Sequence, residues 1–330
     1  MRTRELLNLE NTGHQGINAL FAKAHSADWD IERDVDWSVS INSDEPLVEY
    51  EWGAFGRTPT FQALPDHAKN YVTRRGLGRM INILQVGESV AQDVCAKIAL
   101  SVRQEDYRNH AVAQAMDEAR HHLAYRRFLD KMNEQPEDID FGTEMMFDDL
   151  LSQTDPLRLI ATEQFFLESL AMNLFESMQR HARNPLLREI ITLITRDESR
   201  HMGFGVLYIA EWMRTHSLDE QIDFARPWLG QILMIVTDRP GPLMLSRMTQ
   251  RLSEIGVDYD AAQMLHEQQS INAAEIADMK SGKKVPHLLK SARRAGLLKP
   301  EILEALGIAE HPVVRAAIRE PVQEGSAIGA

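Results

Sequence analysis

The chain has 330 residues, of which 44% are hydrophobic and 26% charged, a composition typical of a globular protein and not of a disordered or collagen-like one. Lysine and arginine number 36 against 49 aspartate and glutamate residues, and the formal charge of −13 argues against nucleic acid and anionic membrane surfaces as partners. Because Cys95 is the only cysteine, an intramolecular disulfide, a cysteine-ligated zinc site and an iron–sulfur cluster are excluded. The first residues form no apolar signal segment, and no run of about 18 apolar residues occurs, so we expect a cytoplasmic protein.

Residues 1–66 are expected to form an N-terminal extension that packs on the main domain. Within it, residues 29–66 mix aromatic residues with proline, glycine and aspartate, which favours ordered loops and short helices. Apolar residues then recur every three or four positions from Leu77 to Val102, and a second such stretch covers residues 103–131. The segment 133–140 interrupts this pattern with proline and turn-forming residues. Two long helices are therefore predicted before residue 133.

Two further long helices are predicted from their start signals. Asp155-Pro156 and Asn184-Pro185 each place a capping side chain directly before a proline in the first helical turn. The third helix is expected to extend to about residue 178 and the fourth to about residue 214. Together the four helices predict a bundle domain over residues 67–239.

Pro240-Gly241-Pro242 separates this domain from a predicted C-terminal helical extension over residues 240–330. Residues 243–310 have the pattern of shorter amphipathic helices, and the segment from about His311 is expected to be loosely held. Alternating strand patterns are nearly absent. The predicted fold class is therefore all-α, with a four-helix bundle and additional helices.

An internal repeat identifies the residues whose side chains could bind a metal or take part in catalysis. Glu-x-x-His occurs twice, at Glu118–His121 and at Glu198–His201, each time within the longer motif Asp-Glu-x-Arg-His. The shift along the sequence that superposes these two motifs also places Glu88 on Glu168. The two halves of the bundle therefore carry the same three candidate groups.

The spacing of these groups suits a pair of metal ions. Residues three apart share a helix face, so each Glu-x-x-His can offer a carboxylate and an imidazole to one ion. Glu88 and Glu168 each lie 30 residues before the glutamate of their motif. This interval allows the chain to finish one helix, turn and return along an antiparallel neighbour to a similar height in the bundle. Such a pattern is typical of two-metal carboxylate sites in helical bundles. The predicted ligands are Glu88, Glu118, His121, Glu168, Glu198 and His201.

A solvent-exposed cluster of salt bridges is the alternative interpretation for any one of these motifs. However, Glu88 falls within the apolar stripe of Ile81, Leu84, Ala91 and Cys95, which should be buried. Four carboxylates placed in a buried bundle would repel one another and lose hydration, whereas bound metal ions offset both effects. The repeat therefore favours the metal site.

The aspartates and arginines of the two motifs are expected to support the ligands. A metal-bound imidazole needs its second nitrogen to donate to an acceptor, which fixes the ring. Asp117 and Asp197 are the candidates, arranged crosswise, with Asp117 on His201 and Asp197 on His121. Arg120 and Arg200 are expected to pair with these aspartates, although ordinary surface arginines are the alternative.

The sequence resembles the ferritin-like di-iron carboxylate superfamily. The resemblance is carried by residues 195–208, by Asp-Glu-Ala-Arg-His at 117–121 and by the N-terminal pattern from Leu20 to Ser38, and it covers about residues 17–215. Within the superfamily the chain is most similar to oxidases related to the ribonucleotide reductase small subunit and to the hydroxylase subunits of di-iron monooxygenases. The resemblance implies that the six ligands bind two iron ions, or one manganese and one iron.

Two departures limit what the resemblance implies. Related ligand-binding oxidases carry a tyrosine five residues before the third ligand, cross-linked to a valine, whereas this chain has Glu163 there and Val90 as the valine. The cross-link is therefore not expected. Tyr125 has the spacing of the radical tyrosine of ribonucleotide reductase, but the tail lacks the relay aromatics, so we expect Tyr125 to pack in the core.

The function that follows is a non-haem di-iron oxygenase or oxidase that uses O₂ to oxidise a small organic substrate by hydroxylation, N-oxygenation, desaturation or cleavage. An electron donor such as a reductase or ferredoxin is expected, and a homodimer is allowed. The alternatives are a ferroxidase or iron-storage protein and a radical-generating subunit. The predicted neighbours of the ligands favour an enzyme with an apolar cavity, and include Leu84, Ala91, Phe165, Ala171, Met172, Ile194 and Gly205.

The third helix offers two carboxylates for one ligand position. The repeat selects Glu168, with Glu163 as an additional or alternative ligand. On an α-helix the two residues would lie about 7.5 Å apart along the axis and about 140° apart around it, so we expect that they do not serve one site equally and that Glu163 reaches only its rim.

Overall fold

The structure is a computed structural model that describes residues 9–133, 138–237 and 241–319. These residues form helices and loops, with two isolated bridges and no strand. The all-α prediction is therefore confirmed. The helices are α2 (Gln15–Ser26), η1 (Tyr50–Trp52), α3 (Pro59–Gln62), α4 (Asp66–Ser101), α5 (Glu105–Met132), α6 (Phe141–Ser152), α7 (Pro156–Ile160), η2 (Ala161–Leu167), α8 (Glu168–His181), α9 (Pro185–Thr215), α10 (Leu218–Thr237), α11 (Pro242–Glu254), α12 (Ala261–Lys280), α13 (His287–Arg294), α14 (Pro300–Ala305) and α15 (Pro312–Arg319).

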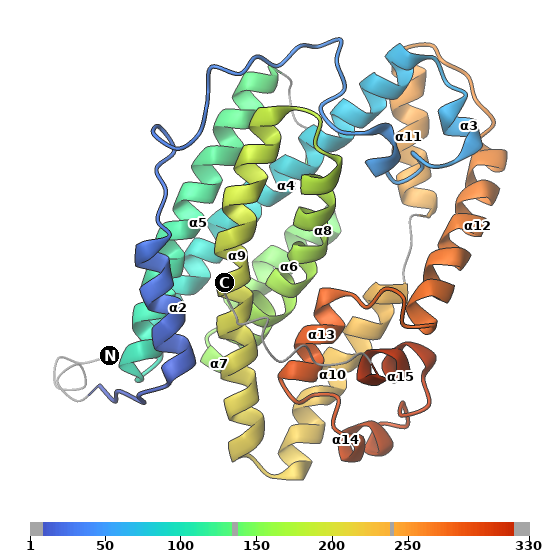
Figure 1. The fold of residues 1–330 in the computed structure, drawn as a ribbon. Coiled ribbons are helices and arrows are strands. Elements are labelled where there is room, and N and C mark those ends of the chain that lie inside the picture. Colours follow the sequence, from blue (N-terminus) through green and yellow to red (C-terminus); the bar gives the residue numbers. More distant parts are fainter. Residues whose placement is uncertain (1–8, 134–137, 238–240, 320–330) are drawn as a thin grey trace.

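Four long elements form the bundle that positions the site: α4, α5, the continuous α7–η2–α8 helix, and α9 (Figure 1). The start signals expected from the sequence are present. The Asp155 side chain accepts a hydrogen bond from the Leu157 N–H, and the Asn184 side chain accepts one from the Leu187 N–H, with proline in the first turn of both helices. The bundle is ferritin-like, as expected.

The third bundle helix contains a π-helical segment that the sequence analysis did not predict. In η2 the backbone bonds join residues five apart, and the Glu168 N–H donates to the Glu163 carbonyl. Gly205 of α9 lies directly against this segment. A Cβ added at Gly205 would come within 2.4 Å of the Gln164 backbone, so only glycine permits this close approach.

The N-terminal segment lies along one side of the bundle, where α2 packs against α5 and α9 (Figure 1). Ile17 and Leu20 of α2 are buried there. The loop that follows buries Trp29 and Val35 in the cluster formed by α5, α8 and α9. Residues 29–66 form ordered loops with the short helices η1 and α3, in agreement with the sequence analysis.

The C-terminal helices form a second apolar cluster on the lower end of α9 (Figure 1). Leu229 of α10, Leu288 of α13 and Val314 of α15 are buried in it. The expectation that the chain is loosely held from His311 is therefore wrong for Pro312–Arg319, because this helix buries an apolar face. Residues 320–330 lie outside the described residues. The domain boundaries at 66 and 239 stay a prediction.

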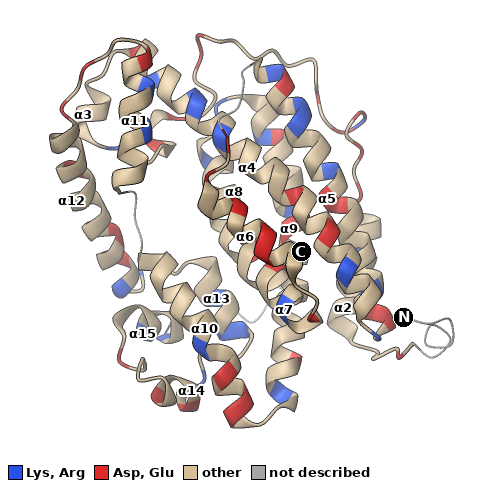
Figure 2. Ribbon diagram, turned by 180° about the vertical axis from the view of Figure 1, so that it is seen from behind, with Lys and Arg blue, Asp and Glu red and all other residues tan. Residues whose placement is uncertain are grey.

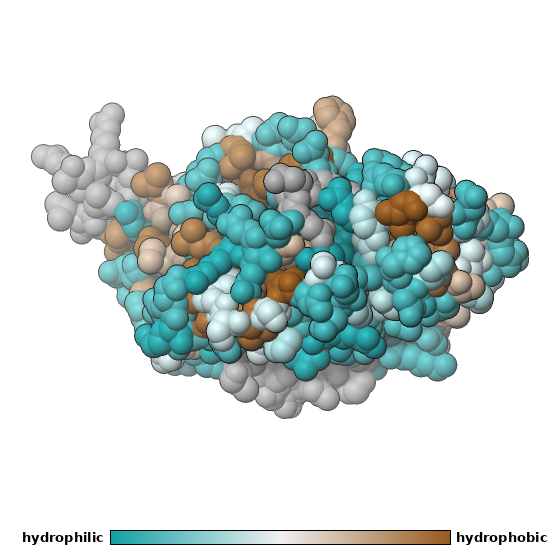
Figure 3. All heavy atoms as spheres, turned by 90° about the horizontal axis from the view of Figure 1, so that it is seen from above, coloured by the Kyte–Doolittle hydropathy of each residue, from teal (hydrophilic) through white to brown (hydrophobic). Residues whose placement is uncertain are grey.

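Basic and acidic residues are both scattered over the helices (Figure 2), and the face seen from above is mostly hydrophilic with scattered hydrophobic patches (Figure 3). Within the described parts of the chain, no helix has the length and apolar character needed to cross a membrane.

Candidate metal centre

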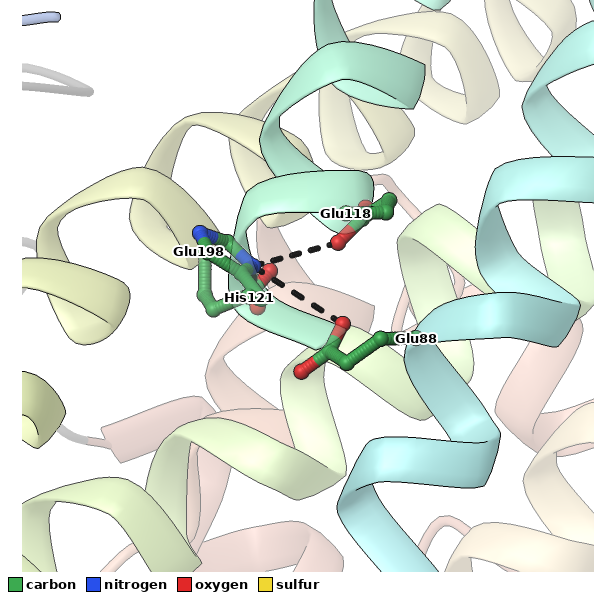
Figure 4. A group of neighbouring side chains, drawn as sticks. All are labelled: Glu88, Glu118, His121 and Glu198. Atoms are coloured by element: carbon green, nitrogen blue, oxygen red, sulfur yellow. Dashed lines mark ion pairs between the residues drawn. The ribbon is translucent and has the colours of Figure 1, made fainter. Parts of the chain in front are cut away.

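The six predicted ligands converge at the middle of the bundle. Glu88 comes from α4, Glu118 and His121 from α5, Glu168 from the start of α8, and Glu198 and His201 from α9. All six are buried. Figure 4 shows four of them pointing toward one another from three helices. The 3.6-residue period of α5 and α9 explains the pairing, since a glutamate and a histidine three positions apart share a face.

The six side chains form two groups whose ligand atoms all lie within 4.8 Å of one another. One group is Glu88, Glu118, His121 and Glu198, and the other is Glu118, Glu168, Glu198 and His201. In the first group, His121 Nδ1 lies 3.0 Å from Glu198 Oε1, 3.3 Å from Glu118 Oε2 and 3.7 Å from Glu88 Oε2.

The second group repeats this arrangement. His201 Nδ1 lies 2.7 Å from Glu198 Oε2, 3.2 Å from Glu118 Oε1 and 3.5 Å from Glu168 Oε1. Glu118 and Glu198 therefore give one oxygen to each group, whereas Glu88 and Glu168 each serve one. Two shared and two terminal carboxylates with one imidazole per group is the donor set of a two-metal carboxylate site.

Burial and mutual charge determine the protonation of this cluster. Burial raises the pKa of Glu88 and of Glu168 well above the ordinary value, and the charge of Glu198 raises it further. Burial also acts to raise the pKa of Glu118, but the charge of His201 and hydrogen bonds to His121 and His201 together outweigh it, and the pKa falls to about 2. Burial disfavours charged imidazoles, yet neighbouring carboxylates raise the pKa of both His121 and His201. The two imidazoles and the shared carboxylates thus stabilise one another's charged forms.

The donor atoms fit a pair of metal ions. Among the described residues, Glu118 Oε2 and His121 Nδ1 are buried 3.3 Å apart, and neither atom forms a hydrogen bond of good geometry. Buried polar atoms are nearly always paired, so atoms left unpaired in the centre of a carboxylate cluster indicate donors for a cation. Carboxylate and imidazole donors suit iron.

The other nitrogen of each imidazole contacts an aspartate from the opposite motif. His121 Nε2 lies 3.1 Å from Asp197 Oδ2, and His201 Nε2 lies 3.1 Å from Asp117 Oδ2. Asp197 also accepts a 2.7 Å hydrogen bond from the Trp29 indole N–H. These are the crosswise contacts expected from the sequence, and they fix the orientation of both rings.

Arg120 and Arg200 pair with the two aspartates that hold the imidazoles. Arg200 Nη2 lies 2.8 Å from Asp197 Oδ1 and 3.0 Å from Asp117 Oδ2, so one guanidinium joins both aspartates. Arg120 contacts Asp117 and Asp28 and lies 5.0 Å from the Trp29 ring centroid. The interpretation of these residues as ordinary surface arginines is wrong, because Arg200 is buried and Arg120 is largely so.

The sequence analysis missed two neighbours of the site. Gln114 Nε2 donates to Glu118 Oε1 at 2.8 Å and to Glu168 Oε1 at 3.2 Å. Its position one turn before Glu118 on α5 is the signal that was available. Trp29 is the other, although it stands in the N-terminal pattern that carries the family resemblance. Tyr125 is fully buried in the core, as expected.

Glu163 lies at the same cavity wall as Glu168, which corrects the expected angle of about 140° between them on an α-helix. Because residues five apart stack in a π-helix, both carboxylates face the bundle interior. Burial and the charges of Glu118 and Glu198 raise the pKa of Glu163 to about 8. The α-helical geometry assumed from the sequence was wrong at this point.

A cavity of about 450 Å³ adjoins the carboxylates, between α4, α6 and the η2–α8 segment. Leu84, Ala91 and Ala171 line it, as expected from their spacing. Phe165, Met172 and Ile194 instead pack in the core. The volume is in the range of small-molecule sites.

Comparison with known proteins decides the family. The sequence model of the family described as p-aminobenzoate N-oxygenase AurF matches residues 10–274. The chain belongs to the AurF family. Among solved structures, an R2-like ligand-binding oxidase from Sulfolobus acidocaldarius is 15% identical, with a TM-score of 0.43 over 79% of this chain and 88% of that one. A search of curated proteins finds no match.

As an AurF-family member, the protein is an O₂-dependent di-iron oxygenase or oxidase that acts on a small molecule. Its buried glutamate and histidine cluster is consistent with a dinuclear iron site. The di-iron superfamily that the motifs indicated is confirmed by the match to the AurF family model.

Proposed function

We propose that Glu88, Glu118, His121, Glu168, Glu198 and His201 bind the two iron ions, and that the reaction is oxygen transfer to the nitrogen of an organic amine. The observation that carries this proposal is the pair of four-residue groups that share Glu118 and Glu198 beside an apolar cavity. N-oxygenation is the member of the expected reactions that the family description supports.

When bound, the iron pair supplies the redox chemistry that activates O₂. The chain supplies the geometry and the environment. Asp117 and Asp197 hold the imidazoles with their Nδ1 atoms toward the carboxylates. The apolar cavity wall excludes water and seats the substrate beside the site. In the metal-free chain the pKa of Glu163, raised to about 8, keeps a proton on this carboxyl group at the cavity wall at neutral pH.

Conversion of an amine and O₂ into a hydroxylamine and water requires two electrons and two protons from outside. We therefore propose a reductase or ferredoxin as the electron donor. The single buried cysteine fits a reducing compartment, which supports the expected cytoplasmic location.

The test is metal analysis followed by a reaction with O₂. Iron-loaded protein is expected to hold two iron ions per chain and, when reduced, to consume O₂ faster with an accepted amine and release a product heavier by one oxygen atom. Glu118→Ala, which removes a shared carboxylate, should lose at least one ion and the activity. Accumulation of many ferric ions per chain, with no effect of any amine, would replace this proposal with the ferroxidase alternative.

A further inference from the structure

The cavity beside the carboxylates has an unusual charge pattern. Its inner end is formed by four glutamates, Glu88, Glu163, Glu168 and Glu198. The remaining wall is apolar, with the amide of Asn173 as its other polar group. No lysine, arginine or histidine is among the described residues that line it.

From this pattern we infer that the substrate is an amine whose remaining surface is apolar and carries no acid group. This inference rests on the proposed function, because it takes the cavity to be the substrate site. An amine N–H can donate to Glu163, which is not among the proposed iron ligands, whereas a substrate carboxylate against the apolar remainder of the wall would lose hydration without gaining a counter-charge. The chain is thus expected to disfavour an aminobenzoate, even though that compound appears in the family description.

The nearest group of basic side chains does not change this conclusion. Arg79, Arg247 and Arg251 line a neighbouring cavity of about 280 Å³, and Arg79 Nη2 lies 2.6 Å from Asp140 Oδ2. Arg79 also precedes Glu88 by nine positions on α4, about 13 Å along the axis at a rise of about 1.5 Å per residue. Arg79 does not line the cavity beside the carboxylates, and its guanidinium group is paired with Asp140.

Helix α6, which packs on α4, contributes Met146 and Phe147 to the cavity wall. Met146 lines the cavity and is 41% exposed, whereas its neighbour Met145 is 55% exposed and does not line it. A lysine at position 146 could keep its ammonium group in water while facing a ligand in the cavity. The two methionines therefore offer a matched pair for adding one positive charge inside or outside the site.

The experiment compares two ligands that share an amine and differ at the opposite end: 4-aminobenzoate and its uncharged analogue of equal heavy-atom count, 4-isopropylaniline. Dissociation constants are measured by anaerobic calorimetry on ferrous protein with two iron ions. We expect 4-isopropylaniline to bind at least about tenfold more tightly, since its alkyl group gains from burial and a carboxylate does not. Equal or tighter binding of 4-aminobenzoate would overturn the inference.

Two variants test where the selection arises. Met146→Lys should tighten binding of 4-aminobenzoate by up to about fivefold, the upper end of the range for an exposed ion pair, and Met145→Lys should not. Ala171→Phe, which fills the cavity, should weaken the binding of 4-isopropylaniline at least about tenfold. Ala273→Phe, on the exposed face of α12, should leave this binding unchanged. Indistinguishable lysine variants would mean that the ligand binds elsewhere.

Failure of this inference and failure of the proposed function give different results. Protein that holds two iron ions and consumes O₂ with amines, but prefers the acid, refutes only the inference. Protein that does not hold two iron ions refutes the proposed ligands, independently of any ligand affinity.

Discussion

Glu163 and Glu168 are the two residues whose roles the sequence left open. Both are buried, and both line the cavity. Only Glu168 lies within reach of a histidine in a four-residue group, since its Oε1 is 3.5 Å from His201 Nδ1. Glu168 therefore lies within one of the two four-residue groups and Glu163 lies outside both, which supports Glu168 as the proposed ligand.

We expect Glu168→Ala to lower the iron content from two ions to one, because the second group loses its only terminal carboxylate. Glu163→Ala should retain two. Metal analysis after identical iron loading and desalting measures both. Loss of iron in the Glu163 variant alone would identify Glu163 as the ligand and Glu168 as the wall carboxylate.

Glu163 should also make the stability of metal-free protein depend on pH. Burial raises its pKa in the folded state to about 8 from an ordinary value of 4.5, so between these values the folded chain holds a proton that the unfolded chain has released. The free energy of unfolding should therefore fall as pH rises from about 4.5 to about 8. Denaturant titrations should show a shallower fall in Glu163→Gln, and an unchanged slope would contradict the assignment.

At the scale of elements, the sequence predicted the helices well but not their local geometry. Helix starts at Pro156 and Pro185 follow from side-chain caps and proline, which act within a few residues. The π-helical segment depends on how the third helix packs against Gly205 of α9, a contact between segments that are well separated in the sequence. Periodicity cannot reveal such a contact. Two glutamates five positions apart beside a predicted site were the only hint.

Gly205 provides a test of this packing. A methyl group there would meet the backbone at Gln164 and Phe165, which cannot move as a flexible side chain can. We expect Gly205→Ala to destabilise the fold by about 1–3 kcal/mol and to lower iron occupancy, since Glu163 and Glu168 flank the displaced segment. Gly230→Ala, at an exposed site in α10 with open space, should stabilise by up to about 1 kcal/mol. Equal effects in chemical denaturation would show that the close approach is unimportant.

At the scale of the whole molecule, the bundle and the six converging residues could be predicted because the internal repeat that relates Glu118–His121 to Glu198–His201 encodes both. Each motif needs only helical geometry to present its glutamate and histidine. The C-terminal part could not be predicted as well. Its helices bury apolar faces against α9 and α10 through contacts distant in sequence, and so residues 312–319 were wrongly expected to be loosely held.

The cluster should couple metal binding to global stability. Four buried carboxylates repel one another when no cation is bound. An ion that binds only the folded state adds about 2.7 kcal/mol to the free energy of unfolding when its free concentration is 100 times its Kd. We therefore expect chelation to lower the Tm by several °C in differential scanning calorimetry. Glu118→Ala, with its shared carboxylate removed, should respond less. An unchanged Tm in chelated wild-type protein would mean that the site is unimportant for folding.

Trp29 is positioned to act as an intrinsic fluorescent probe of the candidate metal centre. Its ring is stacked on His121 with 6.3 Å between ring centroids, and its N–H is held by Asp197. An iron ion on His121 would quench the fluorescence of this indole far more than that of Trp212 or Trp228, which lie in the cluster with the C-terminal helices. Iron titration should therefore dim emission until occupancy is complete, and Trp29→Phe should remove most of that change. The fluorescence of Trp29 in the N-terminal segment would then report the iron occupancy of the site during loading.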